Sequence, residues 1–243
     1  MYALNDDDSD FFEKKYWDAF LKNDFPAYEK YWLKYIIPLT NRPINIHFKT
    51  HQELLNEGYV HEDVCKAQLH FTVLRRLGRA FEILTHLQSK AYQTIIDTDL
   101  LAEGIFHIVA AQDVAFEFLQ RMSTPNQFDE WAPNSRIPLN KSKTTSEDAQ
   151  RKWRNDNHYP LQKIRDYRNN LAHGRILPSF PKVDKICLPK IGRELLYLDW
   201  RLVTDNTSLS HLSNDFDTLD GILNDAWSQT IKYINDEWEK LNF

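Results

Sequence analysis

Glycine, cysteine and long apolar runs are scarce in this chain of 243 residues. Its six glycines form neither GxGxxG nor GxxxxGK[ST], so those two kinds of phosphate loop have no support. The cysteines, Cys65 and Cys187, lie far apart and predict reduced thiols rather than a disulfide framework. No apolar run approaches the length of a membrane span, and the acidic first ten residues do not resemble a signal peptide. We therefore expect a cytoplasmic protein with no membrane partner.

Positive charge is also in short supply, with 30 basic against 35 acidic residues. A protein that coats nucleic acid would need a strongly basic face instead. Between residues 151 and 175, however, seven Lys and Arg side chains are opposed only by Asp156 and Asp166. This local excess of positive charge predicts a binding site for an anionic ligand.

Hydrophobic residues make up 42% of the chain and recur mainly at helical spacing. The pattern predicts an all-α fold with helices over residues 10–22, 26–37, 61–90, 98–122, 160–173 and 214–241. The last four predict an up-and-down four-helix bundle, and the first two are extra N-terminal helices. Asp97 or Thr98 is the expected N-cap of its helix. Gly78 is expected to permit close helix approach.

Two domains are expected, with the boundary near residue 60. Residues 1–59 would be an aromatic-rich helical extension packed on the core, irregular over 38–60. Residues 60–243 would form the bundle, with a polar insertion at about 123–159. Two β-prone segments, 185–190 and 194–203, could pair around Ile191–Gly192 as a small hairpin insertion.

The helix expected over 160–173 carries a charge where its pattern calls for an apolar residue. Leu161, Ile164, Arg168 and Leu171 fall on one stripe, so Arg168 needs either a partner, such as Asp113, or a functional role. His173 follows five positions later, at the expected helix end. A helix C-terminus and a bound phosphate both favour a protonated imidazole, which suits acid–base chemistry near neutral pH.

The run Arg168-Asn169-Asn170-Leu171-Ala172-His173-Gly174 resembles the motif of HEPN domains, in which an Arg and a polar residue precede a His near a helix end. Arg42, Arg79 and Arg151 are also followed by a His after a gap of four to six residues. Of these four arginines, only Arg168 is followed directly by Asn and then by a Leu-Ala-His-Gly helix end. The architectural resemblance covers about residues 60–240.

This resemblance implies a metal-independent endoribonuclease that needs no cofactor and leaves 2′,3′-cyclic phosphate ends. His173 would be the acid–base group, Arg168 would stabilise the phosphate, and Asn169 would orient the histidine or the ribose. Further contacts to RNA phosphates would come from four other basic residues of the region, Arg154, Lys163, Arg165 and Arg175. HEPN ribonucleases are usually dimers with two facing motifs, which implies a homodimer here.

Other interpretations stay open. A HEPN-like module could bind nucleotide, RNA or protein without cleaving, or a helical interaction protein could use His173 only as a helix cap. Zinc binding has little support, because His47 and His51 lack an obvious third ligand. Trp131 and Trp153 in the insertion could stack on single-stranded bases.

Overall fold

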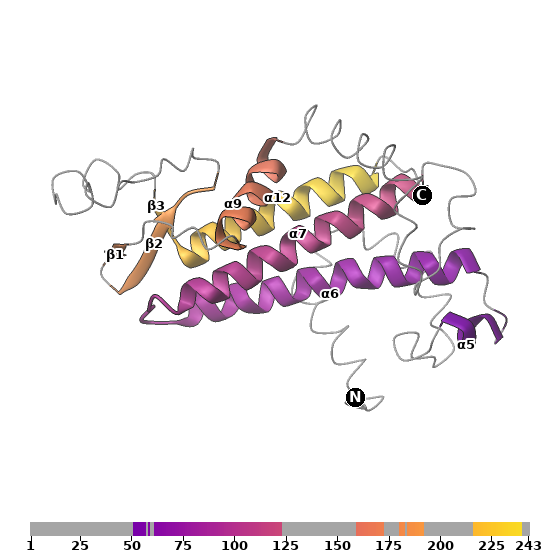
Figure 1. Ribbon diagram of the computed structural model, residues 1–243, viewed down its shortest axis with the longest axis horizontal. Coiled ribbons are helices and arrows are strands. Elements are labelled where there is room, and N and C mark those ends of the chain that lie inside the picture. The colour runs from indigo at the N-terminus through magenta and orange to yellow at the C-terminus, as the bar shows by residue number, and fades with distance from the viewer. Residues whose placement is uncertain are drawn as a thin grey trace. The chain divides into compact units, whose positions relative to one another are not determined.

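The computed structural model describes residues 51–56, 58, 61–122, 159–172, 180–182, 184–191 and 216–239. This part of the chain is mostly helical and carries a small antiparallel sheet (Figure 1). The expectation of a mostly helical protein is therefore confirmed. The helices predicted over 10–22 and 26–37, and the insertion predicted at 123–159 up to its last residue, lie outside the described ranges.

Four long helices lie close to their predicted positions: α6 (His61–Ser89), α7 (Asp97–Met122), α9 (Tyr159–Ala172) and α12 (Leu219–Glu239). A fifth, the short α5 (His51–Asn56), lies in the segment 38–60 that was expected to be irregular. Within this short helix, Gln52 Nε2 donates to Asn56 Oδ1, four residues later, at 3.0 Å. A helix of six residues is too short to show an apolar period, so the pattern missed it.

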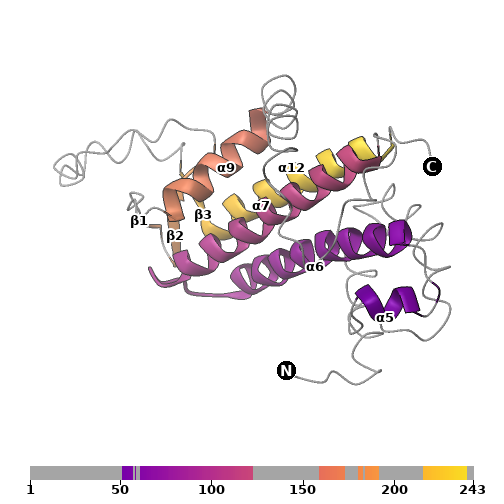
Figure 2. The same cartoon turned by 45° about the vertical axis from the view of Figure 1, so that its right-hand side comes forward.

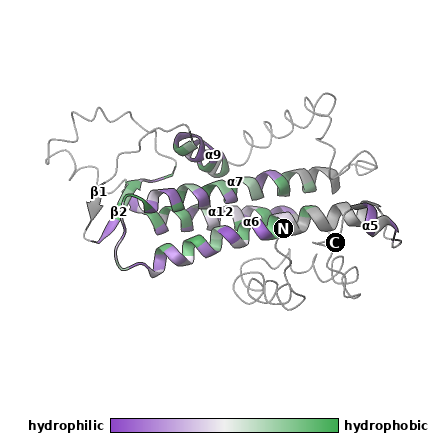
Figure 3. Cartoon of the chain, turned by 60° about the horizontal axis from the view of Figure 1, so that its bottom comes forward, coloured by the Kyte–Doolittle hydropathy of each residue, from purple (hydrophilic) through white to green (hydrophobic). Residues whose placement is uncertain are grey.

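Apolar periodicity identified the buried faces of the long helices correctly. The whole second stripe of α6 is buried, namely Leu69, Val73, Leu77, Ala80, Leu84 and Leu87. The predicted seams of α7 and α12 are buried wherever their side chains are described: Leu101, Ile105, Ile108, Ala115, Leu219, Ile222, Leu223, Ala226, Trp227 and Ile234. Figure 3 shows the resulting alternation of hydrophobic and hydrophilic residues along these helices.

The chain divides into two compact units. The first comprises residues 1–74, 112–148 and 231–243, and the second comprises 75–111 and 149–230. In the first unit, buried apolar side chains come from α6, α7 and α12: Leu69, Val73, Leu74, Ala115, Phe116, Phe118, Ile231, Tyr233 and Ile234. The domain boundary expected near residue 60 stays a prediction.

The second unit holds the described part of the candidate site. Within it, α6 contacts α12 through Phe81 and Trp227, whose ring centroids are 5.4 Å apart. The unit's segments of α6, α7 and α12 lie side by side, and α9 lies on the side away from α6 (Figures 1 and 2). Each of the four long helices contributes buried apolar side chains to this unit.

A glycine allows α7 to approach α12 closely. A Cβ added to Gly104 would come within 2.8 Å of both Cδ atoms of Leu223, closer than real contacts allow. The close helix approach expected at Gly78, which is buried on α6, stays a prediction. The sequence did not indicate Gly104, because which glycine faces a neighbour depends on how the helices are rotated.

The sheet has the strand order β1-β2-β3, with β1 (Phe180–Lys182), β2 (Lys185–Pro189) and β3 (Phe216–Thr218) antiparallel to their neighbours. Cys187 pairs with Phe180 on one side and Thr218 on the other. The strand expected at 185–190 is confirmed, but its described partners are β1 and β3. The expected partner, 194–203, lies outside the described residues. A three-residue strand with a central proline, as in β1, gives almost no sequence signal.

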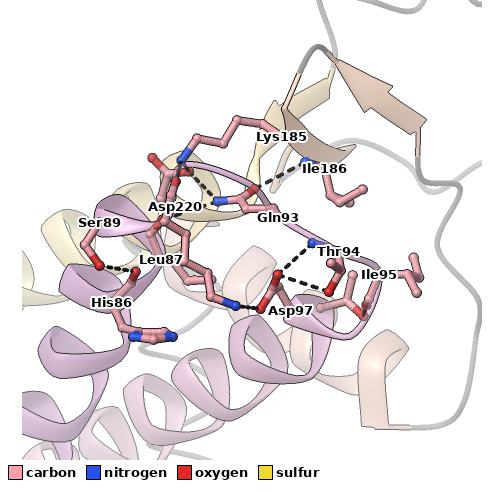
Figure 4. A network of polar contacts seen from close by, with 12 residues as sticks. His86, Leu87, Ser89, Gln93, Thr94, Ile95, Asp97, Lys185, Ile186 and Asp220 are labelled. Atoms are coloured by element: carbon pink, nitrogen blue, oxygen red, sulfur yellow. Dashed lines mark hydrogen bonds and ion pairs between the residues drawn. The ribbon is translucent and has the colours of Figure 1, made fainter.

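Gln93, in the link between α6 and α7, holds the sheet to the helices (Figure 4). Its side chain is buried and donates to Leu87 O and to Asp220 Oδ1, each at 3.3 Å. Its Oε1 accepts from Ile186 N at 3.2 Å, and its own backbone N donates to Asp184 O at 2.9 Å. One amide side chain thereby joins α6, β2 and α12.

Asp97 stabilises the same link from inside the first turn of α7. Its carboxylate accepts from Thr94 N at 2.7 Å and from Lys90 Nζ (Figure 4). Burial alone would raise the pKa of Asp97, but the bonds from Lys90 and Thr94 outweigh burial, and the net pKa is lowered. Asp97 and Thr98 were the expected N-cap candidates, but neither caps the helix. The Asp97 carboxylate instead accepts from Thr94 N, and Thr98 Oγ1 donates to Ile95 O.

Candidate functional site

The described part of the candidate site lies on α9. Pro160 falls in the first turn of this helix, where its missing N–H group removes no helical bond. Lys163, Arg165, Arg168 and Asn169 all belong to α9, and the helix ends at Ala172. His173, Arg175 and Arg154 lie outside the described residues, so their predicted roles stay predictions.

The buried face of α9 includes the expected stripe and extends beyond it. Leu161 and Ile164 are almost completely buried, as predicted, while Arg168 and Leu171 are half-buried. Arg168 therefore does lie on the buried side, at the spacing that its sequence position implies. A guanidinium in such a place loses part of its hydration and needs acceptors in return.

Arg168 lacks such acceptors in the described part of the chain. Its Nε is buried and has no hydrogen-bond partner there. The suggested partner, Asp113, belongs to the other compact unit, so that alternative stays a prediction. A buried donor without a partner costs about 1–3 kcal/mol, so this atom is a sign of a missing ligand on α9.

Arg165 differs from the outer phosphate contact that the sequence suggested. It is only 9% exposed, more deeply buried than Arg168, and it has an interaction of its own. Its position three residues before Arg168 places it on the adjoining part of the same helix face. Lys163 is half-buried and also has an interaction.

Tyr167 is a buried polar residue that the sequence argument overlooked. It is 2% exposed, and its hydroxyl has no hydrogen-bond partner among the described residues. This burial raises the pKa of the phenol well above its ordinary value, so the hydroxyl stays protonated. The sequence did contain a signal for this burial, because Tyr167 lies three residues after Ile164 and therefore on the same side of the helix. The hydroxyl is a neutral donor, and α9 thus buries polar atoms of both Tyr167 and Arg168.

The exposed side of α9 carries two neighbouring asparagines with different surroundings. Asn170 Nδ2 donates to Asp166 O at 2.9 Å, one turn earlier in the helix. Asn169 is exposed and makes no hydrogen bond to another described residue. Asn169 therefore has its amide available for a ligand, as its predicted role requires.

Metal binding would need several ligand side chains close together. The described part of the chain does not supply them. No group of three or more His, Cys, Asp or Glu side chains there is placed to hold a metal ion. His51 lies in α5, whereas His47 lies outside the described ranges. None of the described helices is both long and apolar enough to span a membrane.

Comparisons with known protein families, with characterised proteins and with solved structures find no match to this chain.

Proposed function

We propose that this protein is a metal-independent endoribonuclease of the HEPN type, with its active site at α9 and the residues that follow it. The proposal includes a four-helix up-and-down bundle and a homodimer. The buried Nε of Arg168, which lacks a hydrogen-bond partner among the described residues, is the observation that carries it. Phosphate oxygens would supply the acceptors that this guanidinium lacks.

RNA brings its own nucleophile to such a site, the 2′-hydroxyl group. The 2′-oxygen attacks the adjacent phosphorus, the bond to the 5′-oxygen breaks, and a 2′,3′-cyclic phosphate and a free 5′-hydroxyl result. His173 moves a proton in this reaction, removing one from the 2′-hydroxyl or delivering one to the leaving oxygen. Arg168 stabilises the negative charge on the equatorial oxygens of the phosphorane.

The remaining residues of the site bind and orient the RNA. Asn169 is exposed at the end of α9 and would hydrogen-bond the ribose or His173. Arg154, Lys163 and Arg175 would hold flanking phosphates, and Arg165 would support Arg168 from its buried position. Because one histidine does not easily act as base and acid together, the second would come from the partner in a homodimer.

The test is RNA cleavage in EDTA by the wild type and by Arg168→Leu, Asn169→Ala and His173→Ala. We expect His173→Ala to lose about 10²–10⁴-fold in rate, and Arg168→Leu about 10²–10³-fold, from the usual size of such effects. Asn170→Ala is the matched control for Asn169→Ala, and Arg79→Leu is the matched control for Arg168→Leu. Both controls alter polar residues outside the proposed catalytic set.

The folded state should tolerate the Arg168→Leu change. Replacing a buried donor that lacks a partner with an apolar group is expected to change the free energy of unfolding by less than about 1 kcal/mol. Cleavage that survives both Arg168→Leu and His173→Ala would disprove the assignment. Thermal stabilisation by RNA or nucleotide without any turnover would instead identify the non-catalytic binding module.

A further inference from the structure

A second polar cluster joins the outer faces of α6 and α7 in the second unit. Arg76 Nη1 donates to His107 Nδ1 at 3.1 Å, and its guanidinium carbon lies 6.0 Å from the centre of the Phe106 ring. Phe106 and His107 meet edge to face, with centroids 5.7 Å apart. Arg79 donates to Glu103 Oε1 from Nη2 at 2.9 Å and from Nε at 3.1 Å.

The two arginines of this cluster differ in how their charge is balanced. Arg79 pairs with Glu103 and, at 3.4 Å, with Glu82, and the bond to Glu103 raises its pKa. Arg76 has no carboxylate partner in the described part of the chain, since its contacts there are His107 and the Phe106 ring. Its neighbour Arg75 is exposed and likewise forms no ion pair with a described residue.

His107 does not offset or add to this charge near neutral pH. Its Nδ1 accepts from Arg76, which requires the proton of the neutral ring to be on Nε2, 3.7 Å from Glu103 Oε1. Burial, followed by the nearby positive charge of Arg76, lowers the pKa of His107. Arg76 therefore keeps its positive charge beside a neutral ring, and Arg75, the preceding residue of α6, adds a second exposed charge.

Phe106 exposes part of its aromatic side chain next to Arg76. It is 49% exposed, although the neighbouring Ile105 and Ile108 on α7 are completely buried. A phenyl ring this exposed is not one of the buried side chains of the core. An exposed ring bordered by guanidinium groups is the combination that single-stranded nucleic acids use, because bases stack on the ring and phosphates pair with the cations.

We propose that Arg75, Arg76 and Phe106 form a binding surface for single-stranded RNA, in which Phe106 stacks on a base and the two arginines hold adjacent phosphates. An acidic peptide would use the charges but would lack a planar group for the ring. The three residues belong to α6 and α7, and within this unit α9 lies on the side away from α6 (Figures 1 and 2). This inference does not depend on RNA cleavage.

The experiment measures binding of a fluorescent 2′-O-methyl oligouridylate, which cannot be cleaved through its 2′-oxygen, over a series of salt concentrations. Phe106→Leu keeps an apolar side chain but removes the ring, and we expect Kd to rise about 5-fold or more, since stacking contributes about 1–3 kcal/mol per base. Phe106→Tyr should bind like the wild type. Arg76→Ala should reduce the salt slope by about 0.7, while Arg76→Lys should preserve it.

Tyr92→Leu is the matched control, because Tyr92 is an aromatic residue that is 73% exposed in the link between α6 and α7. Unchanged binding by Phe106→Leu, or an equal loss in Tyr92→Leu, would overturn the proposal. Equal affinity for an oligoglutamate peptide would do so as well, and would identify an acidic protein as the partner. Binding that is retained by His173→Ala and lost by Phe106→Leu separates this surface from the proposed catalytic site.

Discussion

Gly104 is a single residue on which the spacing of two helices depends. We expect Gly104→Ala to lower the free energy of unfolding by about 1–3 kcal/mol, because its new Cβ would overlap the buried Leu223 side chain. The higher helix propensity of alanine, about 1 kcal/mol, would offset part of this loss. Urea denaturation measures the difference.

A double-mutant cycle isolates the cause of this loss. Leu223→Ala removes the atoms with which the added methyl group collides, so Gly104→Ala should cost less in that background. An equal cost in both backgrounds would show that the close approach of α7 and α12 is not responsible.

His107 makes the stability of the protein depend on pH. Its pKa in the folded protein is lower than the ordinary value of 6.5, mainly because of burial and secondarily because of Arg76. The unfolded chain therefore binds more protons as the pH falls, and stability that is present above pH 6.5 is lost as the pH drops below it. Urea unfolding of the wild type at pH 7.5 and 5.5 should show this loss.

His107→Gln provides the comparison for this pH effect, because glutamine does not titrate. The difference in unfolding free energy between the two pH values should be smaller in His107→Gln than in the wild type. The other eight histidines of the chain remain in both proteins and cancel in the comparison. An identical pH dependence would contradict the assigned shift.

At the scale of elements, Gln93 decides where the small sheet is attached. Gln93→Leu would leave the backbone N–H of Ile186 without its acceptor and remove the bond to Asp220. We expect a destabilisation of about 1–3 kcal/mol and faster amide hydrogen exchange in β2. Hydrogen-exchange mass spectrometry of peptides covering 184–191 measures the second effect.

Gln162→Leu is the matched control for Gln93→Leu. Gln162 makes an exposed bond to Asp166 one turn along α9, so its loss should leave both stability and exchange in β2 nearly unchanged. Equal effects of the two substitutions would mean that the bonds of Gln93 do not anchor the sheet.

The elements differ in how much of their structure the sequence reveals. Helices such as α6 carry many apolar residues at one spacing, and their bounds and buried faces were predicted almost correctly. The strands have three to five residues, and their partners are set by bonds such as that from Ile186 to Gln93, 93 positions apart. Local pattern cannot encode a pairing that depends on where distant helices place their side chains.

At the scale of the whole molecule, the proposed homodimer has a measurable consequence. If each catalytic site needs His173 from both protomers, a mixed dimer of wild type and His173→Ala is inactive. When equal amounts of wild type and His173→Ala pair at random, the mixture should keep about a quarter of the activity of the same total amount of wild type. If the sites are independent, it should keep about half. Sedimentation velocity on the wild type provides the control, since a monomer would exclude the shared site.

The sequence by itself determined the long helices, their apolar faces and the unusual position of Arg168, because each follows from residue spacing within one segment. Only the tertiary structure decided that Arg165 and Tyr167 are buried, that Gly104 is the close approach to α12, and that Phe106 and Arg76 share one surface. These facts depend on the rotation and neighbours of each helix. The rotation of each helix is set by contacts between segments far apart in the chain, and the residue pattern within one segment does not reveal those contacts.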